Sequence, residues 1–109
     1  MAIVMNMRWT EATLEQYDAL NELLNLEQEI PTGAIFHVAA HDGTQMRVTD
    51  VWESAEAFQT FVDTRLMPAV QQVGVQGEPT IEILPAHNII NAATVIDLTG
   101  TKAGAARAT

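Results

Sequence analysis

The sequence contains no cysteine and few charged residues, and each shortage excludes a class of protein. Without cysteine the chain forms no disulfide, uses no thiolate nucleophile and holds no cysteine-ligated zinc. Only 17% of the residues are charged, and 5 basic residues against 14 acidic ones give a net charge of -9. The basic residues are scattered along the chain, so the basic patch that nucleic acids and anionic membranes require is missing. We therefore expect neither nucleic acid nor membrane as a partner.

Long apolar runs and a secretory signal are also missing. No run approaches the roughly 18 apolar residues that span a bilayer, and the first residues lack a basic flank and a cleavage site. A cytoplasmic protein is therefore expected. The chain is instead rich in dispersed apolar residues, which make up 48% of its 109 residues. A small domain so lean in charge often buries apolar surface against a second copy, so we expect a homodimer.

Hydrophobic periodicity predicts the element order βαββαβ. The predicted elements are a strand over residues 2–8, a helix over 11–27, strands over 34–41 and 45–53, a helix between Ser54 and Gly74, and a strand over 79–85. Pro68 is expected to kink or split the second helix. With right-handed crossovers this order predicts an α+β, ferredoxin-like fold with an antiparallel sheet. We expect one domain over residues 1–90, followed by a C-terminal arm and mobile tail over 91–109.

The predicted hairpin brings polar side chains together. Asp42-Gly43 is typical of a two-residue turn, which would place His37 diagonal to Asp50. Strand alternation then divides the hairpin into two faces. One face carries Ile35, His37, Ala39, His41, Met46, Val48, Asp50 and Trp52, and the other carries Phe36, Val38, Ala40, Arg47, Thr49 and Val51. Both faces are largely apolar, and a second subunit is the economical cover for the face that the helices leave open.

Several stretches resemble one known superfamily. They are Val51-Trp52-Glu53-Ser54, then Phe58 and Phe61, then Leu66-Met67-Pro68-Ala69, with Asn6, the approach from Pro31-Thr-Gly33 to His37, and Pro85-Ala-His87-Asn88 in agreement. Over about residues 2–90 the chain resembles the dimeric α+β barrel superfamily, and within it the antibiotic-biosynthesis-monooxygenase-like proteins. The resemblance implies two sheets joined back to back in a dimer, with a pocket between the sheet and the helices of each subunit.

The same group is functionally broad, and it includes cofactor-free quinone-forming monooxygenases, haem-degrading monooxygenases and polyketide cyclases. Haem-degrading members resemble this chain at Asn6, but their helix also carries a buried tryptophan and an axial histidine. Phe61 and Gln71 stand at the matching positions here. The resemblance therefore argues against haem, and no cofactor is expected.

Three residues are candidates for catalysis: His37, Asp50 and Asn6. A carboxylate beside an imidazole orients the ring for acid–base work near neutral pH. An amide in an apolar strand costs free energy unless it is hydrogen-bonded, so Asn6 is a candidate for holding a substrate oxygen. A purely structural role stays open for all three, because buried polar groups are hydrogen-bonded as a rule.

The aromatic side chains either line a substrate pocket or form the core. The candidates for substrate binding are Trp52, Phe58, Phe61 and Trp9. A metal site made of His37, His41 and His87 is not expected, because about 13 Å of strand separates the first two.

The sequence thus predicts a homodimeric barrel enzyme that acts on a small apolar aromatic or polyketide-like compound. The expected chemistry is cofactor-independent monooxygenation or a cyclisation, with His37 as acid and base and Asp50 orienting it. The alternative is a non-catalytic ligand-binding or assembly protein with the same barrel.

Overall fold

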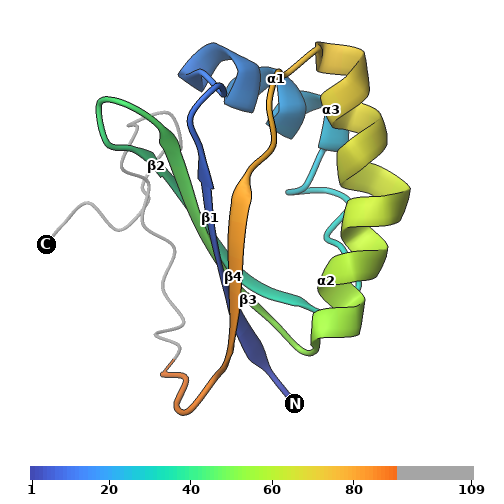
Figure 1. The fold of residues 1–109 in the computed structure, drawn as a ribbon. Helices are drawn as coiled ribbons and strands as arrows, with labels where there is room; N and C mark the ends of the chain where they lie inside the picture. Colours follow the sequence, from blue (N-terminus) through green and yellow to red (C-terminus); the bar gives the residue numbers. More distant parts are fainter. Residues whose placement is uncertain (91–109) are drawn as a thin grey trace, which may run out of the picture.

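The computed structural model of the chain describes residues 1–90, and the predicted element order is confirmed there. The elements are β1 (Ile3–Trp9), α1 (Leu14–Leu24), β2 (Ala34–His41), β3 (Met46–Trp52), α2 (Ala55–Phe61), the π-helical turn η1 (Val62–Leu66), α3 (Met67–Val73) and β4 (Thr80–Pro85). The four strands form one antiparallel sheet in the order β2-β3-β1-β4. This is the predicted α+β, ferredoxin-like arrangement, with the helices on one side of the sheet (Figure 1). The predicted arm and tail lie outside the described residues.

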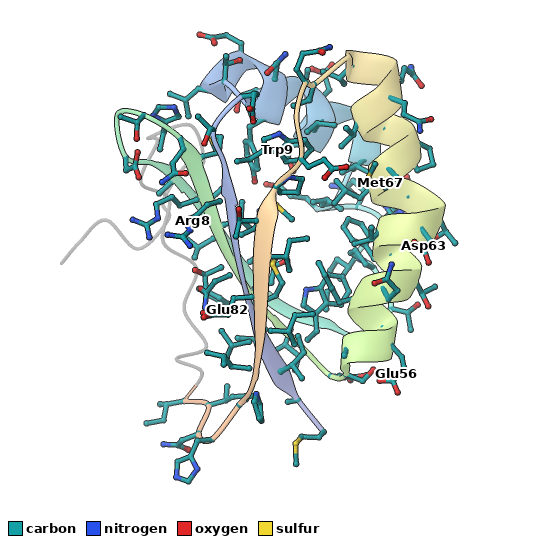
Figure 2. The ribbon with its side chains drawn as sticks, viewed as in Figure 1. Arg8, Trp9, Glu56, Asp63, Met67 and Glu82 are labelled. Carbon is teal, nitrogen blue, oxygen red and sulfur yellow. The ribbon has the colours of Figure 1, made fainter. Side chains whose placement is uncertain are left out.

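Strand β1 shows why the two sides of the sheet differ. Its alternate residues Ile3, Met5, Met7 and Trp9 are buried against the helices, whereas Arg8 is exposed on the opposite side. In Figure 2, Trp9 points toward the helices, and Arg8 and Glu82 point away from them. Within residues 1–90 no helix covers this second side, and three of its large apolar side chains stay about half exposed: Phe36 at 54%, Val38 at 46% and Leu84 at 47%. We call this side the open face.

Helix α1 begins later than the sequence suggests. The threonine that caps it is Thr13, whose hydroxyl accepts the N–H of Gln16 while the Gln16 side chain accepts the N–H of Thr13. This reciprocal capping box satisfies two backbone donors that would otherwise lack partners. The helix ends where Asn25 adopts a left-handed conformation with φ of 52°. No helix in the described part of the chain is long and apolar enough to span a bilayer.

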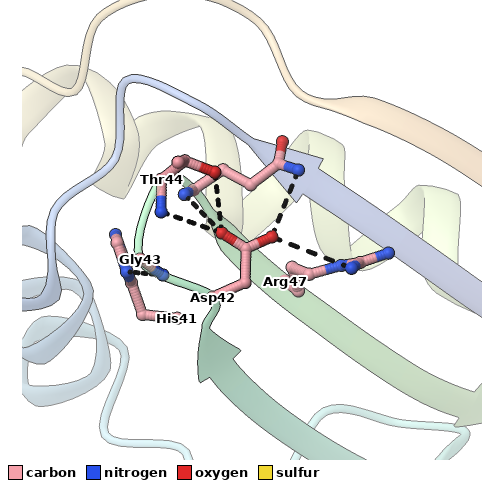
Figure 3. Close-up of polar contacts among 6 residues, drawn as sticks. His41, Asp42, Gly43, Thr44 and Arg47 are labelled. Carbon is pink, nitrogen blue, oxygen red and sulfur yellow. Dashed lines mark hydrogen bonds and ion pairs between the residues drawn. The ribbon is translucent and has the colours of Figure 1, made fainter.

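The hairpin between β2 and β3 has a four-residue loop, so the predicted two-residue turn is wrong. The Asp42 carboxylate accepts the backbone N–H groups of Thr44 and Gln45 at 2.9 and 3.0 Å, and the Thr44 hydroxyl at 2.8 Å (Figure 3). These bonds hold two further residues in the loop, in the manner of an Asx turn. His41 therefore pairs with Met46, and His37 stands directly opposite Asp50.

A register shift of two residues leaves the faces of the strands unchanged, because strand alternation has a period of two. The exception is Ile35. The β2–β3 register shifts between Ala34 and Phe36, so Ala34 and not Ile35 stands opposite Trp52. A bulge of this kind adds one residue to a strand and redirects its side chains.

The second helix is interrupted just before Pro68, as predicted. Ser54 caps its start by accepting the N–H of Ala57. Further on, the N–H of Met67 bonds to the carbonyl of Val62, which makes the wide π turn η1. Proline offers no N–H and crowds the carbonyl four residues before it, so a widened turn at this point relieves both problems.

Candidate functional site

A cavity of about 450 Å³ lies between the helix-covered side of the sheet and the helices. Its walls are mainly apolar, and the segment between α1 and β2 forms part of them with Leu26, Ile30 and Pro31. Arg65 on η1 holds this segment by donating to the backbone carbonyls of Leu24 and Glu29, both at 2.8 Å. The size and apolar lining of the cavity are those of a site for a small organic molecule.

One wall of the cavity carries a chain of hydrogen bonds through four side chains. The Tyr17 hydroxyl lies 2.7 Å from Nε2 of His37, and Nδ1 of His37 lies 2.6 Å from Oδ1 of Asp50. The second carboxylate oxygen of Asp50 accepts the indole N–H of Trp52 at 3.0 Å. We call Tyr17, His37, Asp50 and Trp52 the relay, and all four side chains line the cavity.

The backbone explains how the relay assembles. His37 and Asp50 are direct cross-strand partners, and Trp52 lies two residues beyond Asp50 on the same side of β3. Helix α1 lays Tyr17 over the sheet, where its ring is nearly parallel to the His37 ring, at 5° with the centroids 6.1 Å apart. One helix and the two strands of one hairpin thus supply one continuous network.

Asp50 is the buried polar residue among those described, with 6% of its surface exposed. A carboxylate in such a place is costly unless its oxygens are hydrogen-bonded, and here each oxygen has a donor. Because the carboxylate is an acceptor, the His37 Nδ1–H donates to it. In a neutral imidazole the other nitrogen, Nε2, then accepts the hydroxyl proton of Tyr17.

Tyr17 is a neutral phenol at neutral pH. Burial raises the pKa of Tyr17 above its ordinary value of 10.0, and the negative charges of Asp50 and Asp18 raise it further. The hydroxyl is therefore present as O–H, able to donate one hydrogen bond and to accept others.

The four predicted substrate-binding aromatics both line the cavity and belong to the core. Trp52 packs against Phe58 and Phe61, with ring centroids 5.6 and 5.4 Å apart. Trp9 lies elsewhere on the cavity wall and donates its indole N–H to the carbonyl of Gln76 at 2.8 Å. The same side chains therefore form the core and line the cavity, and their role in substrate binding stays a prediction.

Asn6 does not join the other predicted catalytic residues. It follows Met5, the cross-strand partner of Asp50, and so its side chain falls on the open face. There its amide oxygen accepts the hydroxyl of Thr49 at 2.9 Å, and its amide nitrogen lies 3.5 Å from the carboxylate of Glu82. The sheet thus separates Asn6 from His37, and nothing in this geometry supports a shared substrate for the two residues.

Tyr17 is the member of the relay that sequence reasoning missed. In the sequence it belongs to the apolar stripe of the first helix, three residues before the buried Leu20. One signal was available: it is the single tyrosine of the chain, and a tyrosine that packs in a core needs a partner for its hydroxyl. Of the other histidines, His41 lies at the hairpin, where its Nδ1 accepts the N–H of Gly43.

The fold and the cavity define a class, the ferredoxin-like α+β subunits with an apolar pocket between sheet and helices. Among solved structures, the chain is similar to a variant of SnoaB, a cofactor-independent oxygenase from Streptomyces nogalater, with a TM-score of 0.62 and 11% identity over 84% of this chain and 98% of that one. It is also similar to a monooxygenase from the ActVA-Orf6 gene of Streptomyces coelicolor, solved with the ligand nanaomycin D, with a TM-score of 0.58 and 16% identity over 84% and 93% of the two chains.

A third similar structure is that of a protein of unknown function from Nitrosomonas europaea, with a TM-score of 0.61 and 18% identity over 84% and 95% of the two chains. Neither the models of protein families nor the curated proteins give a match to the sequence. The chain thus has the fold of the antibiotic-biosynthesis-monooxygenase-like proteins, and the resemblance found in the sequence is confirmed for the fold.

Proposed function

We propose that the protein is a small-molecule enzyme that acts on an apolar aromatic or polyketide-like compound by acid–base chemistry, without a cofactor. The observation that carries this proposal is the relay on the wall of an otherwise apolar cavity. His37 lines the cavity and its side chain is 39% exposed, so the base lies at the cavity wall and not in the closed core. Two structures of the same fold support the kind of chemistry, because one belongs to a cofactor-independent oxygenase and the other to a monooxygenase with a bound ligand.

In this proposal His37 is the base, and Asp50 stabilises the imidazolium that forms. For an oxygenation, removal of a proton from an aromatic hydroxyl gives an electron-rich anion that reacts with O₂. A hydroxyarene then becomes a quinone: one oxygen atom forms the new carbonyl, the other leaves as water, and the substrate supplies all four electrons. For a cyclisation, the proton comes from a carbon between two carbonyls, the carbanion attacks a third carbonyl, and the resulting alkoxide takes the proton back.

The experiment is a screen of hydroxynaphthalenes, anthrones and short polyketones, which follows O₂ uptake, quinone absorbance and ring-closed products by mass spectrometry. We expect turnover by the natural sequence and a loss of roughly 10²–10⁴-fold in His37→Ala. His41→Ala is the matched control, because His41 lies outside the cavity. Full activity in His37→Ala would refute the assignment of the base.

The competing function is that of a non-catalytic ligand-binding or assembly protein. One observation favours it: both ring nitrogens of His37 and both oxygens of Asp50 already have partners within the chain. In that case His37→Ala lowers the melting temperature, and the natural protein converts no compound of the screen. Turnover that depends on His37 decides for the enzyme.

We also propose that a second copy of the chain covers the open face. Phe36, Val38 and Leu84 leave apolar surface on it, and a sheet covered on one side only would otherwise carry polar residues there. Light scattering at micromolar concentration should give twice the mass of the chain, and Val38→Glu should halve it. Leu23→Glu, at a 43% exposed site on α1, is the control that should leave the mass unchanged. A monomeric natural protein would exclude this cover.

A further inference from the structure

Neither ring nitrogen of His37 faces the cavity unpaired. Nδ1 is taken by Asp50 at 2.6 Å, and the lone pair of Nε2 faces the Tyr17 hydroxyl at 2.7 Å. A proton leaving a bound compound therefore reaches His37 only if that compound displaces the Tyr17 hydroxyl or if the proton passes through it. The structure must favour one of these routes, and Tyr17 itself lines the cavity.

We infer that Tyr17 is a catalytic residue: its hydroxyl touches the bound compound and relays a proton from a phenolic or enolic hydroxyl of that compound to Nε2 of His37. This inference rests on the proposed function, which it deepens by naming the group that meets the substrate and the hydroxyl that the substrate must carry.

The polarity of the Tyr17 hydroxyl points to such a substrate. A phenol has one proton to donate, and in the resting relay it is given to Nε2 of His37. What remains toward the cavity is the acceptor capacity of the oxygen. The Tyr17 oxygen can therefore accept a hydrogen bond from an O–H group of a ligand. A ligand with carbonyl groups alone would find no donor in Tyr17.

The transfer balances as two linked proton movements. The ligand O–H bond breaks and its proton joins the Tyr17 oxygen, while the O–H bond of Tyr17 breaks and that proton joins Nε2 of His37. The products are a ligand oxyanion, a neutral Tyr17 that now donates to this oxyanion, and an imidazolium whose Nδ1–H remains on Asp50. The same hydroxyl thus changes from acceptor to donor as charge develops on the ligand, which stabilises that charge.

Direct action of a Tyr17 phenolate as the base does not fit the surroundings. Asp50 from β3 and Asp18 beside Tyr17 on α1 are both negative, and Glu27 from the following segment also lines the cavity. Burial first, and then the charges of Asp50 and Asp18, raise the pKa of Tyr17 and favour the neutral phenol, so the proton must go on to His37. Displacement of the hydroxyl is also opposed, because it would break the 2.7 Å hydrogen bond to Nε2 of His37 while α1 holds Tyr17 in place.

The test uses 4-nitro-1-naphthol, a coloured compound whose ionised form has its own absorption band, and its methyl ether, which lacks the hydroxyl. In the natural protein we expect the naphthol to bind roughly tenfold tighter than the ether and to ionise at a lower pH than in water. In Tyr17→Phe both compounds should bind about equally, and the ionisation shift should disappear. The relay is refuted if Tyr17→Phe ionises the bound naphthol at the same pH as the natural protein. It is also refuted if the natural protein binds no naphthol.

A second variant separates a catalytic from a structural Tyr17. Because the chain has one tyrosine, incorporation of 3-fluorotyrosine changes the acidity of this hydroxyl alone and keeps its shape. The ionisation pH of the bound naphthol should move in the fluorinated protein, whereas an unchanged ionisation pH contradicts the relay. The naphthol assay needs no O₂ and forms no new carbon–carbon or carbon–oxygen bond, so it is independent of turnover. A protein that ionises the naphthol through Tyr17 and converts no compound of the screen refutes the proposed function alone, and turnover that survives Tyr17→Phe refutes the relay alone.

Discussion

His37 and Asp50 stand directly opposite each other on β2 and β3, with Nδ1 of the histidine 2.6 Å from Oδ1 of the aspartate. The second oxygen of Asp50 holds the indole N–H of Trp52. Asp50 therefore joins the polar network to the aromatic core, because Trp52 also packs on Phe58 and Phe61. Loss of this carboxylate should affect both stability and acid–base chemistry.

Replacement of Asp50 by alanine should lower the free energy of unfolding by about 1–3 kcal/mol, because the Trp52 N–H is left buried without an acceptor. Asp50→Asn should cost less, since its amide oxygen can still accept that N–H. In both variants the downward shift in the ionisation pH of bound 4-nitro-1-naphthol should disappear, because neither stabilises the imidazolium of His37.

Urea unfolding followed by tryptophan fluorescence measures the stability of these variants. Asp63→Ala is the control, since Asp63 lies on the solvent side of η1 (Figure 2), where substitutions usually change stability by less than about 0.5 kcal/mol. An Asp50→Ala variant as stable as this control would show that the buried carboxylate contributes nothing to the fold.

The single tyrosine should titrate above its ordinary pKa of 10.0, because burial and the charges of Asp50 and Asp18 oppose the phenolate. An absorbance titration near 295 nm measures the phenolate directly. Asp50→Asn removes one of the negative charges and should move the pKa of Tyr17 downward, toward 10.0.

Stability should follow the same shift. A raised pKa in the folded state means that the contribution of Tyr17 is complete below pH 10, and that it is lost as the pH rises above this value through the folded-state pKa. Tyr17→Phe should therefore lose less stability than the natural protein does over that alkaline range. A Tyr17 that titrates at or below its ordinary value would contradict its placement inside the relay.

Asn6→Ala should leave the chemistry of the cavity intact, because Asn6 bonds to Thr49 and lies near Glu82 on the open face. We expect the dissociation constant and the ionisation constant of bound 4-nitro-1-naphthol to stay within about twofold of those in the natural protein, since separated sites act independently. The matched variant is Asn21→Ala, which changes an amide that does line the cavity. If the Asn6→Ala protein binds the naphthol but no longer shifts its ionisation pH, then Asn6 on the open face affects the relay in the cavity.

The order of elements and, apart from Ile35, the faces of the hairpin could be predicted from the sequence, because hydrophobic periodicity determines both. His37 and Asp50 were expected on one face, and they lie there even though the loop between their strands has four residues and not two. The loop length depended on the side chain of Asp42, whose three short hydrogen bonds to the two residues that follow Gly43 cannot be read from the Asp-Gly pair alone.

Contacts between elements were harder to predict. The alternation of Met5, Asn6 and Met7 puts Asn6 on the side of β1 opposite the methionines, but its partner Thr49 depends on how β1 pairs with β3, and nothing in the local pattern gives that register. The bond from Tyr17 to His37 depends on how α1 is rotated over the sheet, and the apolar stripe of a helix leaves that rotation undetermined by a residue or two. The strand residues His37 and Asp50 of the candidate site could therefore be predicted from the sequence, whereas Tyr17 on α1 is known only from the structure.

The Asp42 loop should give the fold a stability that depends on acid pH. Hydrogen bonds from Thr44 and Gln45 hold the pKa of Asp42 well below its ordinary value of 3.8. For a carboxyl group with a lowered pKa, the stabilising contribution is present above the unfolded value and is lost as the pH falls toward the folded one. The natural protein should therefore melt at a higher temperature than Asp42→Asn at neutral pH, and the difference should shrink once the pH falls below 3.8. Arg47, 3.7 Å from the carboxylate, adds little because the pair is exposed.

Melting temperatures of both proteins, measured from neutral pH down to about pH 2 at constant ionic strength, check this. Asp63→Asn serves as the control, since the Asp63 carboxylate accepts a single side-chain hydrogen bond from Gln59 on an exposed helix. The difference between Asp42→Asn and the natural protein should narrow with acid, while that of the control stays small throughout. A difference for Asp42→Asn that is constant over the whole range would mean that the shape of the amide, and not the lost charge, destabilises the loop.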